Sequence, residues 1–272
     1  MRRSMILLCR CLPVLWGLIF VLTGSCHGEV DEAHDVAELF ANKRPNVWGT
    51  DLPGILRRVP HKEKVVALTF DACGGAMRNG RWRTDDYDRQ LIGFLRSRKI
   101  AATLFLNRRW ILAHPQEARD LASDPLFQIE NHGSRHCPLS VTGRKAYGIP
   151  GTVGVEDVIR EVQENSGEIR SLTGHRPRFF RSGTAHYDDV AVEIVRALGY
   201  VVAGFSVNGD QGATLSAYEV ERRILSVSPG DVVLCHMNRP GSGTAEGVRN
   251  AVERLSRMGY RFVILNDLLR LR

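Results

Sequence analysis

From Lys64 onward, short apolar runs alternate with longer amphipathic stretches, and this alternation constrains the fold more than any other feature of the chain. The expected strands are 65–70, 101–106, 127–130, 179–181, 200–206, 232–235 and 261–265. The expected helices are 85–98, 115–122, 155–172, 188–198, 217–226 and 245–258. Strands that alternate with helices in this way pair in parallel through right-handed crossovers. The sequence therefore predicts an α/β fold with a parallel sheet.

Polar side chains recur directly after several of the expected strands. Asp71 follows the first strand, His132 and His136 follow the third, and His236 follows the sixth. In a (β/α) barrel the carboxyl ends of all strands face one mouth, so residues far apart in sequence meet there. We therefore favour a distorted (β/α) barrel over a doubly wound sheet.

The charge of the chain argues against a nucleic-acid partner. The 272 residues are 43% hydrophobic and 25% charged, which is ordinary for a globular protein. The formal charge is +7, but Arg2, Arg3 and Arg10 lie near the amino terminus, and without them 34 of the 37 basic residues stand against 30 acidic ones. This small excess fits weak attraction to an acidic polymer and no nucleic-acid footprint.

The amino terminus has the layout of a secretory signal peptide. Arg2 and Arg3 precede an apolar stretch over 11–21, and small residues follow up to position 28. Residues 1–28 are therefore expected to direct export to the periplasm or the extracellular space. A retained membrane anchor and lipidation at Cys26 are the alternatives, and both would attach the protein to a membrane. Residues 29–60 are expected to form a lead-in and linker, and 61–272 a catalytic domain.

Several of the polar residues have the types that hydrolytic sites use. Two imidazoles four residues apart, His132 and His136, can bind one Zn²⁺-type ion, although such a pair also arises by chance. Asp71 can be a general base, a metal ligand or a turn residue. His236 can donate a proton or pack in the core, and Arg181 can orient a carboxylate or form a surface ion pair.

Five short segments occur in an order and spacing that resemble the motifs of a known family. They are Thr69-Phe70-Asp71, His132-x-Ser134-x-His136-x-x-Leu139, Phe180-Arg181 with Gly183-Thr184, Val207-Asn208-Gly209-Asp210, and Leu234-Cys235-His236. Together they resemble the polysaccharide deacetylase family, which is the NodB homology domain or carbohydrate esterase family 4. The resemblance extends over about residues 64–269.

The resemblance implies a distorted (β/α) barrel that removes acetyl groups from N-acetylated sugars with one divalent metal. Zn²⁺ is the expected metal, and Co²⁺, Mn²⁺ and Ni²⁺ are alternatives. By position, Asp71 would be the general base that takes a proton from the attacking water. His132 and His136 would be metal ligands. His236 would be the general acid that protonates the departing amine.

The same resemblance implies supporting roles for further residues. Arg181 would orient Asp71, and either Asn208 or Asp210 would set the position and the pKa of His236. The backbone N–H near Thr184 would bind the oxyanion. Trp82, in a loop with three arginines, and Tyr187, with its neighbour His186, are the candidate sugar contacts; the alternative for all three is an ordinary surface loop.

Two departures from the family pattern change the expected site. Ala72 stands where the family usually has a second Asp, so the usual carboxylate ligand is absent and the third ligand is open. The candidates are Asp71, Cys73, Asp85, Asp86 and water. Motif three also lacks its usual Pro-Tyr and motif four its Trp, so the apolar wall that receives the acetyl methyl group is expected to be remodelled.

The cysteines that follow the predicted signal peptide each adjoin one of these motifs. They are Cys73, Cys137 and Cys235, and an odd number leaves at least one free thiol in an exported protein. A Cys73–Cys137 disulfide and buried thiols are both open.

Three functions follow from these residues. The first is an exported, metal-dependent hydrolase that removes N-acetyl groups from N-acetylhexosamine units of a polysaccharide or oligosaccharide, such as peptidoglycan, a chitin-like polymer or an exopolysaccharide. The second is a hydrolase of another non-peptide C–N bond or an ester bond. The third is a glycan-binding pseudoenzyme that lost its activity with Ala72. Retention of Asp71, Arg181 and His236 favours an enzyme, because a pure binding protein needs neither a base nor an acid.

Overall fold

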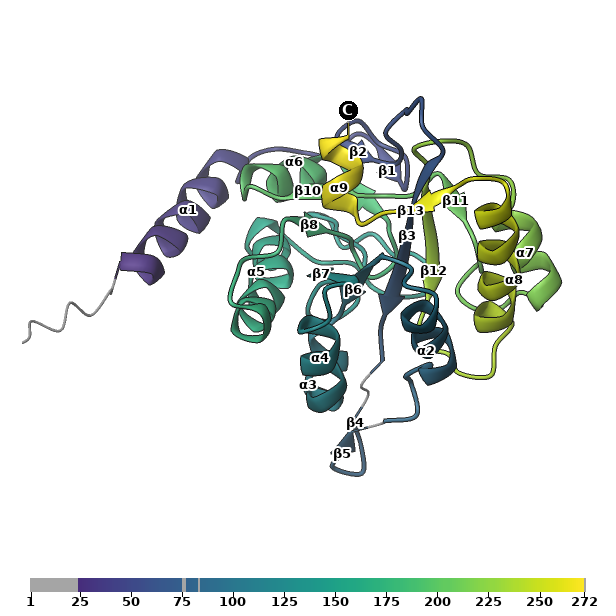
Figure 1. Ribbon diagram of the computed structural model, residues 1–272. Coiled ribbons are helices and arrows are strands. Elements are labelled where there is room, and N and C mark those ends of the chain that lie inside the picture. Colours follow the sequence, from purple (N-terminus) through teal and green to yellow (C-terminus); the bar gives the residue numbers. More distant parts are fainter. Residues whose placement is uncertain (1–23, 75–76, 83, 272) are drawn as a thin grey trace, which may run out of the picture.

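The computed structural model describes residues 24–74, 77–82 and 84–271, and a curled sheet lies at its centre (Figure 1). Its strands are β2 (Ile55–Leu56), β3 (Val65–Ala72), β6 (Ala102–Leu106), β7 (Phe127–Asn131), β8 (Phe179–Phe180), β10 (Val201–Ala203), β11 (Val207–Asn208), β12 (Val232–His236) and β13 (Arg261–Phe262). They follow the order β11-β12-β3-β6-β7-β8-β10-β2, with β13 also paired to β3. Every strand pair described in this sheet is parallel.

Helices cover the outer face of the sheet (Figure 1). The described helices are α1 (Gly24–Phe40), α2 (Arg89–Ser97), α3 (Arg108–Ala113), α4 (Pro115–Ala122), α5 (Val155–Thr173), α6 (Asp189–Ala197), α7 (Ala217–Ile224), α8 (Thr244–Arg257) and α9 (Leu265–Arg270). Two of them do not lie on this face, because α1 packs on α5 and α6, and α9 packs in the cluster that contains Ala67 of β3. The six helices expected between the strands are all present, and α4 has the expected bounds. The parallel sheet curls into a half-barrel, which confirms the predicted fold class.

Strand β3 shows how the two faces of the sheet divide. All of its residues are buried, so it reads in the sequence as one continuous apolar run. Leu68 and Phe70 pack in the cluster that the helices cover, whereas Ala67 belongs to a second cluster. Because side chains alternate along a strand, Thr69 and Asp71 share the face of Ala67. The strand therefore delivers Asp71 to the inner face, at its carboxyl end.

The segment expected as a lead-in is part of the folded body. Strand β2 pairs with β10 at one edge of the sheet. Directly after β2, the N–H of Val59 donates to the carbonyl of Gly230 at 2.8 Å, just before β12 at the other side of the curl. Val36 and Phe40 of α1 pack in a core cluster with residues of α5 and α6.

Two short antiparallel pairs lie outside the main sheet. Strand β1 (Trp48–Gly49) pairs with β9 (Tyr187–Asp188), and β4 (Met77–Arg78) pairs with β5 (Arg81–Trp82). The first pair ties the lead-in segment to the loop after β8.

Most of the predicted signal peptide, residues 1–23, lies outside the described residues, and positions 24–28 form the first turns of α1. In the part of the chain that is described, no helix is long and apolar enough to span a membrane. Export and lipidation at Cys26 stay predictions.

Candidate active site

A cavity of about 520 Å³ opens at the carboxyl ends of β3, β11 and β12. Asp71 and Cys73 line it from the end of β3, His136 from the loop after β7, and Asn208 and His236 from the ends of β11 and β12. The residues that the sequence places after separate strands therefore meet around one cavity.

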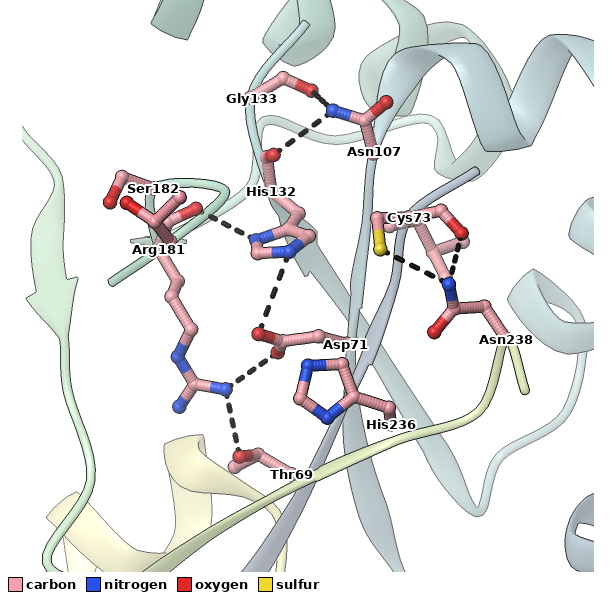
Figure 2. A network of polar contacts seen from close by, with 12 residues as sticks. Thr69, Asp71, Cys73, Asn107, His132, Gly133, Arg181, Ser182, His236 and Asn238 are labelled. Carbon is pink, nitrogen blue, oxygen red and sulfur yellow. Dashed lines mark hydrogen bonds and ion pairs between the residues drawn. The ribbon is translucent and has the colours of Figure 1, made fainter. Parts of the chain in front are cut away.

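Asp71 and Arg181 form a buried ion pair beside this cavity (Figure 2). Nη1 of Arg181 donates to Oδ1 of Asp71 at 2.7 Å and to Oγ1 of Thr69 at 2.9 Å. The carbonyls of Ala203 and Gly204 accept hydrogen bonds from Nε and Nη2 of the same guanidinium. Burial by itself would raise the pKa of Asp71, but the charges of Arg181 and nearby histidines hold that pKa below its ordinary value of 3.8. Asp71 is therefore a carboxylate at neutral pH.

His132 presents an unpaired nitrogen to Asp71. Its Nδ1 donates to the backbone carbonyl of Arg181 at 3.0 Å, which leaves the lone pair on Nε2. Nε2 is buried without a hydrogen-bond partner, 3.5 Å from Oδ2 of Asp71. Burial also lowers the pKa of His132, so the ring is neutral. A neutral imidazole whose other nitrogen is fixed by a carbonyl is the arrangement that metal-binding histidines adopt.

His136 lies next to His132. The two rings meet edge to face with centroids 5.0 Å apart, and burial holds the pKa of His136 well below 6.5. Gly183 packs directly on His136, because a Cβ at position 183 would lie 2.3 Å from the His136 carbonyl carbon. The two imidazoles fit a divalent metal of the Zn²⁺ class. Among the described residues, however, no three His, Cys, Asp or Glu side chains form a group that could hold a metal ion.

Ala72, Asp86 and Cys73 differ in what they can offer as a third ligand. Ala72 is buried and carries no donor, and the carboxylate of Asp86 pairs with Nε2 of His114 at 2.6 Å. Cys73 lines the cavity, where Nδ2 of Asn238 donates to its Sγ at 3.1 Å. Burial and then the charge of Asp71 raise the pKa of Cys73 to about 11, so this thiol is protonated.

His236 is held by Asp210 on the other side of the cavity. Its Nδ1 lies 2.8 Å from Oδ1 of Asp210, and its backbone N–H donates to Oδ2 at 2.7 Å. Oγ1 of Thr244 donates to the same Oδ2 at 2.9 Å. Burial lowers the pKa of His236, but the hydrogen bond and charge of Asp210 raise it above 6.5. Of the two alternatives, Asp210 therefore contacts His236, whereas Oδ1 of Asn208 accepts the N–H of Gln211.

The predicted substrate contacts fall in different places. Thr184 lines the cavity, and its backbone N–H makes no hydrogen bond within the described part of the chain. Tyr187 is fully buried, and its hydroxyl accepts the N–H of Ser182 at 2.6 Å. The prediction that Tyr187 contacts sugar is therefore wrong, because its ring packs in the core. Trp82 lies on β5, and its side chain is outside what the structure describes.

Three residues of the site did not stand out in the sequence. Thr69 binds Arg181, Thr244 binds Asp210, and Asn238 binds both the carbonyl and the Sγ of Cys73. Only Asn238 had a sequence signal, because it follows His236 by two positions at the end of β12. The three cysteines Cys73, Cys137 and Cys235 are free thiols, so the structure contains no Cys73–Cys137 disulfide.

Comparisons with known proteins identify the family of the chain. Residues 58–203 match the protein family described as polysaccharide deacetylase. The peptidoglycan-N-acetylglucosamine deacetylase of Bacillus cereus is 24% identical over 216 residues, which cover 78% of this chain and 91% of the relative. The uncharacterized protein YlxY of Bacillus subtilis is 20% identical over 188 residues, or 68% of this chain. That match spans 54% of YlxY, so the chain corresponds to about half of this relative.

Solved structures share the fold. A wild-type protein of Bacillus anthracis, described as a pseudoenzyme of carbohydrate esterase family 4, gives a TM-score of 0.65 at 21% identity, covering 80% of this chain and 70% of its own. A mutant of the same protein, described as having restored enzymatic activity, gives a TM-score of 0.65 at 22% identity, covering 80% of this chain and 72% of its own.

Proposed function

The chain belongs to the polysaccharide deacetylase family, and on that premise we propose that it is an exported hydrolase that removes N-acetyl groups from N-acetylhexosamine units of a polysaccharide. The observation that carries this proposal is that one cavity holds a candidate base, whose surroundings favour loss of its proton, and a candidate acid, whose surroundings favour keeping it. Asp71 has a lowered pKa and His236 a raised one, and both line the cavity. A protein that only binds glycans has no use for this pairing.

The base side of the reaction rests on Asp71. Its ionised carboxylate accepts the proton of the attacking water, and general bases of this kind contribute about 10²- to 10⁴-fold to rate. Arg181 fixes Oδ1, and Oδ2 faces His132. Because Arg181 is itself held by Thr69 and two carbonyls, the carboxylate is oriented before the substrate binds.

The acid side rests on His236. Its Nδ1–H is directed at Asp210, so Nε2 is the nitrogen that gives a proton to the amine as the C–N bond breaks. Burial lowers the pKa of this imidazole, but the hydrogen bond and negative charge of Asp210 raise it above 6.5, which favours the protonated form that acts as the acid. An amine leaves readily only when it is protonated, so this group supplies what amide hydrolysis needs.

The carbonyl end of the acetyl group has candidate partners too. The N–H of Thr184 is available to the oxygen that becomes negative in the transition state. Ile149, Phe205 and Leu234 give the cavity an apolar wall. The motifs lack their usual Tyr and Trp, so we expect a differently shaped acyl site in this cavity of about 520 Å³. Hydrolysis of another C–N bond or an ester bond is therefore an alternative within the same mechanism.

A metal, when bound, would polarise the acetyl carbonyl and activate the water. His132 and His136 would hold it, because Nε2 of His132 is buried without a partner and both rings are neutral. Asp71 or Cys73 would be the nearest additional donor from the protein, since both line the cavity.

Acetate release tests the proposal. The purified protein is incubated with peptidoglycan, chitotetraose and an acetylated exopolysaccharide, with Zn²⁺, Co²⁺, Mn²⁺ or Ni²⁺ added in turn. We expect release from at least one substrate and a loss of about 10²-fold or more in Asp71→Asn. Asp267→Asn, on a half-exposed residue of α9, is the matched control and should keep the wild-type rate.

A glycan-binding pseudoenzyme is the second candidate. It is favoured by Ala72 and by the missing third donor in the described part of the site. In that case no substrate releases acetate with any metal, and glycans bind equally well to wild type and to Asp71→Asn.

A further inference from the structure

An exposed tyrosine stands at the rim of the cavity on a strained turn. Ala146 and Ile149 exchange backbone hydrogen bonds of 3.1 and 2.9 Å, and Tyr147 and Gly148 form the two-residue turn between them. Both have positive φ, 51° and 76°. A turn of this kind favours Asn-Gly, because a residue with a bulky Cβ is sterically disfavoured at its first position.

Packing of the Tyr147 ring in the core does not offset the strain of this backbone conformation. The Tyr147 side chain is 81% exposed, yet it lines the cavity. An uncommon backbone conformation at an exposed aromatic residue is of the kind that clusters at ligand-binding positions. The strain thus indicates a ligand for this ring outside the protein.

Two other aromatic rings, those of His186 and Trp48, lie in a row beside Tyr147. His186 meets Tyr147 edge to face with centroids 5.1 Å apart, and Trp48 lies 5.8 Å from His186. The guanidinium of Arg144 covers Trp48 at 5.2 Å from the ring centroid. Nδ1 of His186 donates to the carbonyl of Thr184 at 2.8 Å, which links the rings to a residue that lines the cavity.

These rings come from three separate parts of the chain. Trp48 belongs to β1, which β9 anchors through the Trp48–Asp188 register pair. Tyr147 comes from the 146–149 turn, and His186 from the loop after β8. Aromatic rings fixed in this way bind a flat apolar face at low entropic cost. The C–H face of a pyranose ring has that shape, and the neighbouring units of a polysaccharide bound in the cavity must leave along its rim.

We propose that Tyr147, supported at its edge by His186 and Trp48, forms a subsite that stacks against the pyranose ring next to the N-acetylated unit in the cavity. The inference rests on the proposed function for the identity of the polymer. The exposed guanidinium of Arg144 lies over Trp48, where it can bond hydroxyl or carboxylate oxygens of that sugar ring.

Calorimetric titration in the Asp71→Asn background tests the subsite without turnover. Chitotetraose and a peptidoglycan tetrasaccharide are the probes. Removal of the ring in Tyr147→Ala should weaken the affinity for the tetrasaccharide that binds by about three- to tenfold. Tyr147→Phe should retain the affinity. Tyr218→Ala is the matched control, because Tyr218 is 68% exposed on α7 and does not line the cavity.

A second variant separates binding from folding. Tyr147→Asn gives the turn its favoured residues, so it should raise Tm by about 2 °C while it weakens glycan affinity as much as Tyr147→Ala does. A merely structural tyrosine would instead lower Tm in both variants. Unchanged tetrasaccharide affinity in Tyr147→Ala, or binding of neither probe by the parent, overturns the subsite.

The two proposals fail in distinguishable ways. If wild type releases acetate and Tyr147→Ala binds like its parent, the subsite is wrong and the hydrolase stands. If no substrate releases acetate and Tyr147→Ala still binds glycan more weakly than its parent, the hydrolase proposal is wrong, and the subsite belongs to a glycan-binding protein without this activity.

Discussion

Asp71 and His236 are direct register partners in the adjacent parallel strands β3 and β12. Each shifts the other toward its charged form, because the charge of His236 lowers the pKa of Asp71 and the charge of Asp71 raises the pKa of His236. Two titratable groups whose surroundings drive their pKa values in opposite directions are the usual signature of an acid and a base. The strand register therefore accounts for the proposed division of roles.

Asp210→Asn should shift the alkaline limb of the pH–rate profile to lower pH. His236 acts in its protonated form, and loss of the Asp210 charge removes what raises its pKa above 6.5. The activity at the optimum should also fall by about tenfold or more, since the imidazole loses its fixed orientation. The measurement is kcat/KM against pH. Asn208→Ala is the control, because Asn208 contacts Gln211 instead, and an equal shift in that variant would contradict the assignment.

Arg181→Met should be strongly destabilising. Asp71 and Arg181 are 5% and 0% exposed, so the variant leaves a buried carboxylate without its partner, at a cost of about 3–5 kcal/mol. Arg98→Met removes an exposed pair with Glu253 and should cost about 1 kcal/mol or less. Urea denaturation compares the two. Any residual activity of Arg181→Met should have its acidic limb at higher pH, because the charge and hydrogen bond of Arg181 no longer offset the effect of burial on the pKa of Asp71. Equal stability losses in the two variants would be incompatible with this account.

Glu130 should make the protein less stable as the pH rises. Burial raises the pKa of this carboxyl from 4.5 to about 7, although the N–H of Phe179 donates to Oε2 at 2.7 Å. The folded state therefore binds the proton more tightly than the unfolded state. The resulting loss of unfolding free energy is absent below pH 4.5 and reaches its full value, on the order of 3 kcal/mol, above pH 7.

Glu130→Gln tests directly whether this carboxyl causes the loss of stability between pH 4.5 and about 7. Its amide oxygen can still accept the N–H of Phe179 but does not titrate, so the decline in unfolding free energy between pH 4.5 and about 7 should flatten. Glu246→Gln, at an exposed position of α8, should keep the wild-type slope. A decline that persists unchanged in Glu130→Gln would show that another group causes it.

Gly183→Ala should displace His136 without removing any ligand. The new Cβ would lie 2.3 Å from the His136 carbonyl carbon and 2.7 Å from its Cγ, so the backbone or the ring must move. Metal affinity should fall by about tenfold or more. Gly167→Ala on α5, where a Cβ meets nothing within 4 Å, is the control. Unaltered metal affinity in Gly183→Ala would exclude His136 as a ligand.

The strand ends were predictable because they follow from local patterns. Apolar runs that end in a polar residue located Asp71, His236 and the loop of His132 and His136, and parallel topology brings those ends together. In the expected strand 200–206, however, β10 ends at Ala203, and β11 begins only at Val207. The cause is the approach of β2, because the N–H of Gly204 donates to the carbonyl of Leu56 at 2.8 Å. A contact between such distant positions leaves no periodic signal in the sequence.

The supporting residues of the site were harder to predict for the same reason. Thr244 meets Asp210 across 34 positions, and nothing near either residue indicates the contact. Tyr187 follows motif three as a surface residue would, but the pairing of β9 with β1 turns it into the core. Residue type thus identified the acid and the base, whereas tertiary packing decided which neighbours hold them.

Metal content tests the central claim most directly, because it requires no knowledge of the substrate. The purified protein is equilibrated with Zn²⁺, desalted and analysed for metal beside His132→Ala, with the exposed His175→Ala as control. We predict about one metal ion per chain in wild type and His175→Ala, and a loss of that ion in His132→Ala. A wild-type protein that stays metal-free after equilibration would contradict the hydrolase proposed here and leave the glycan-binding function.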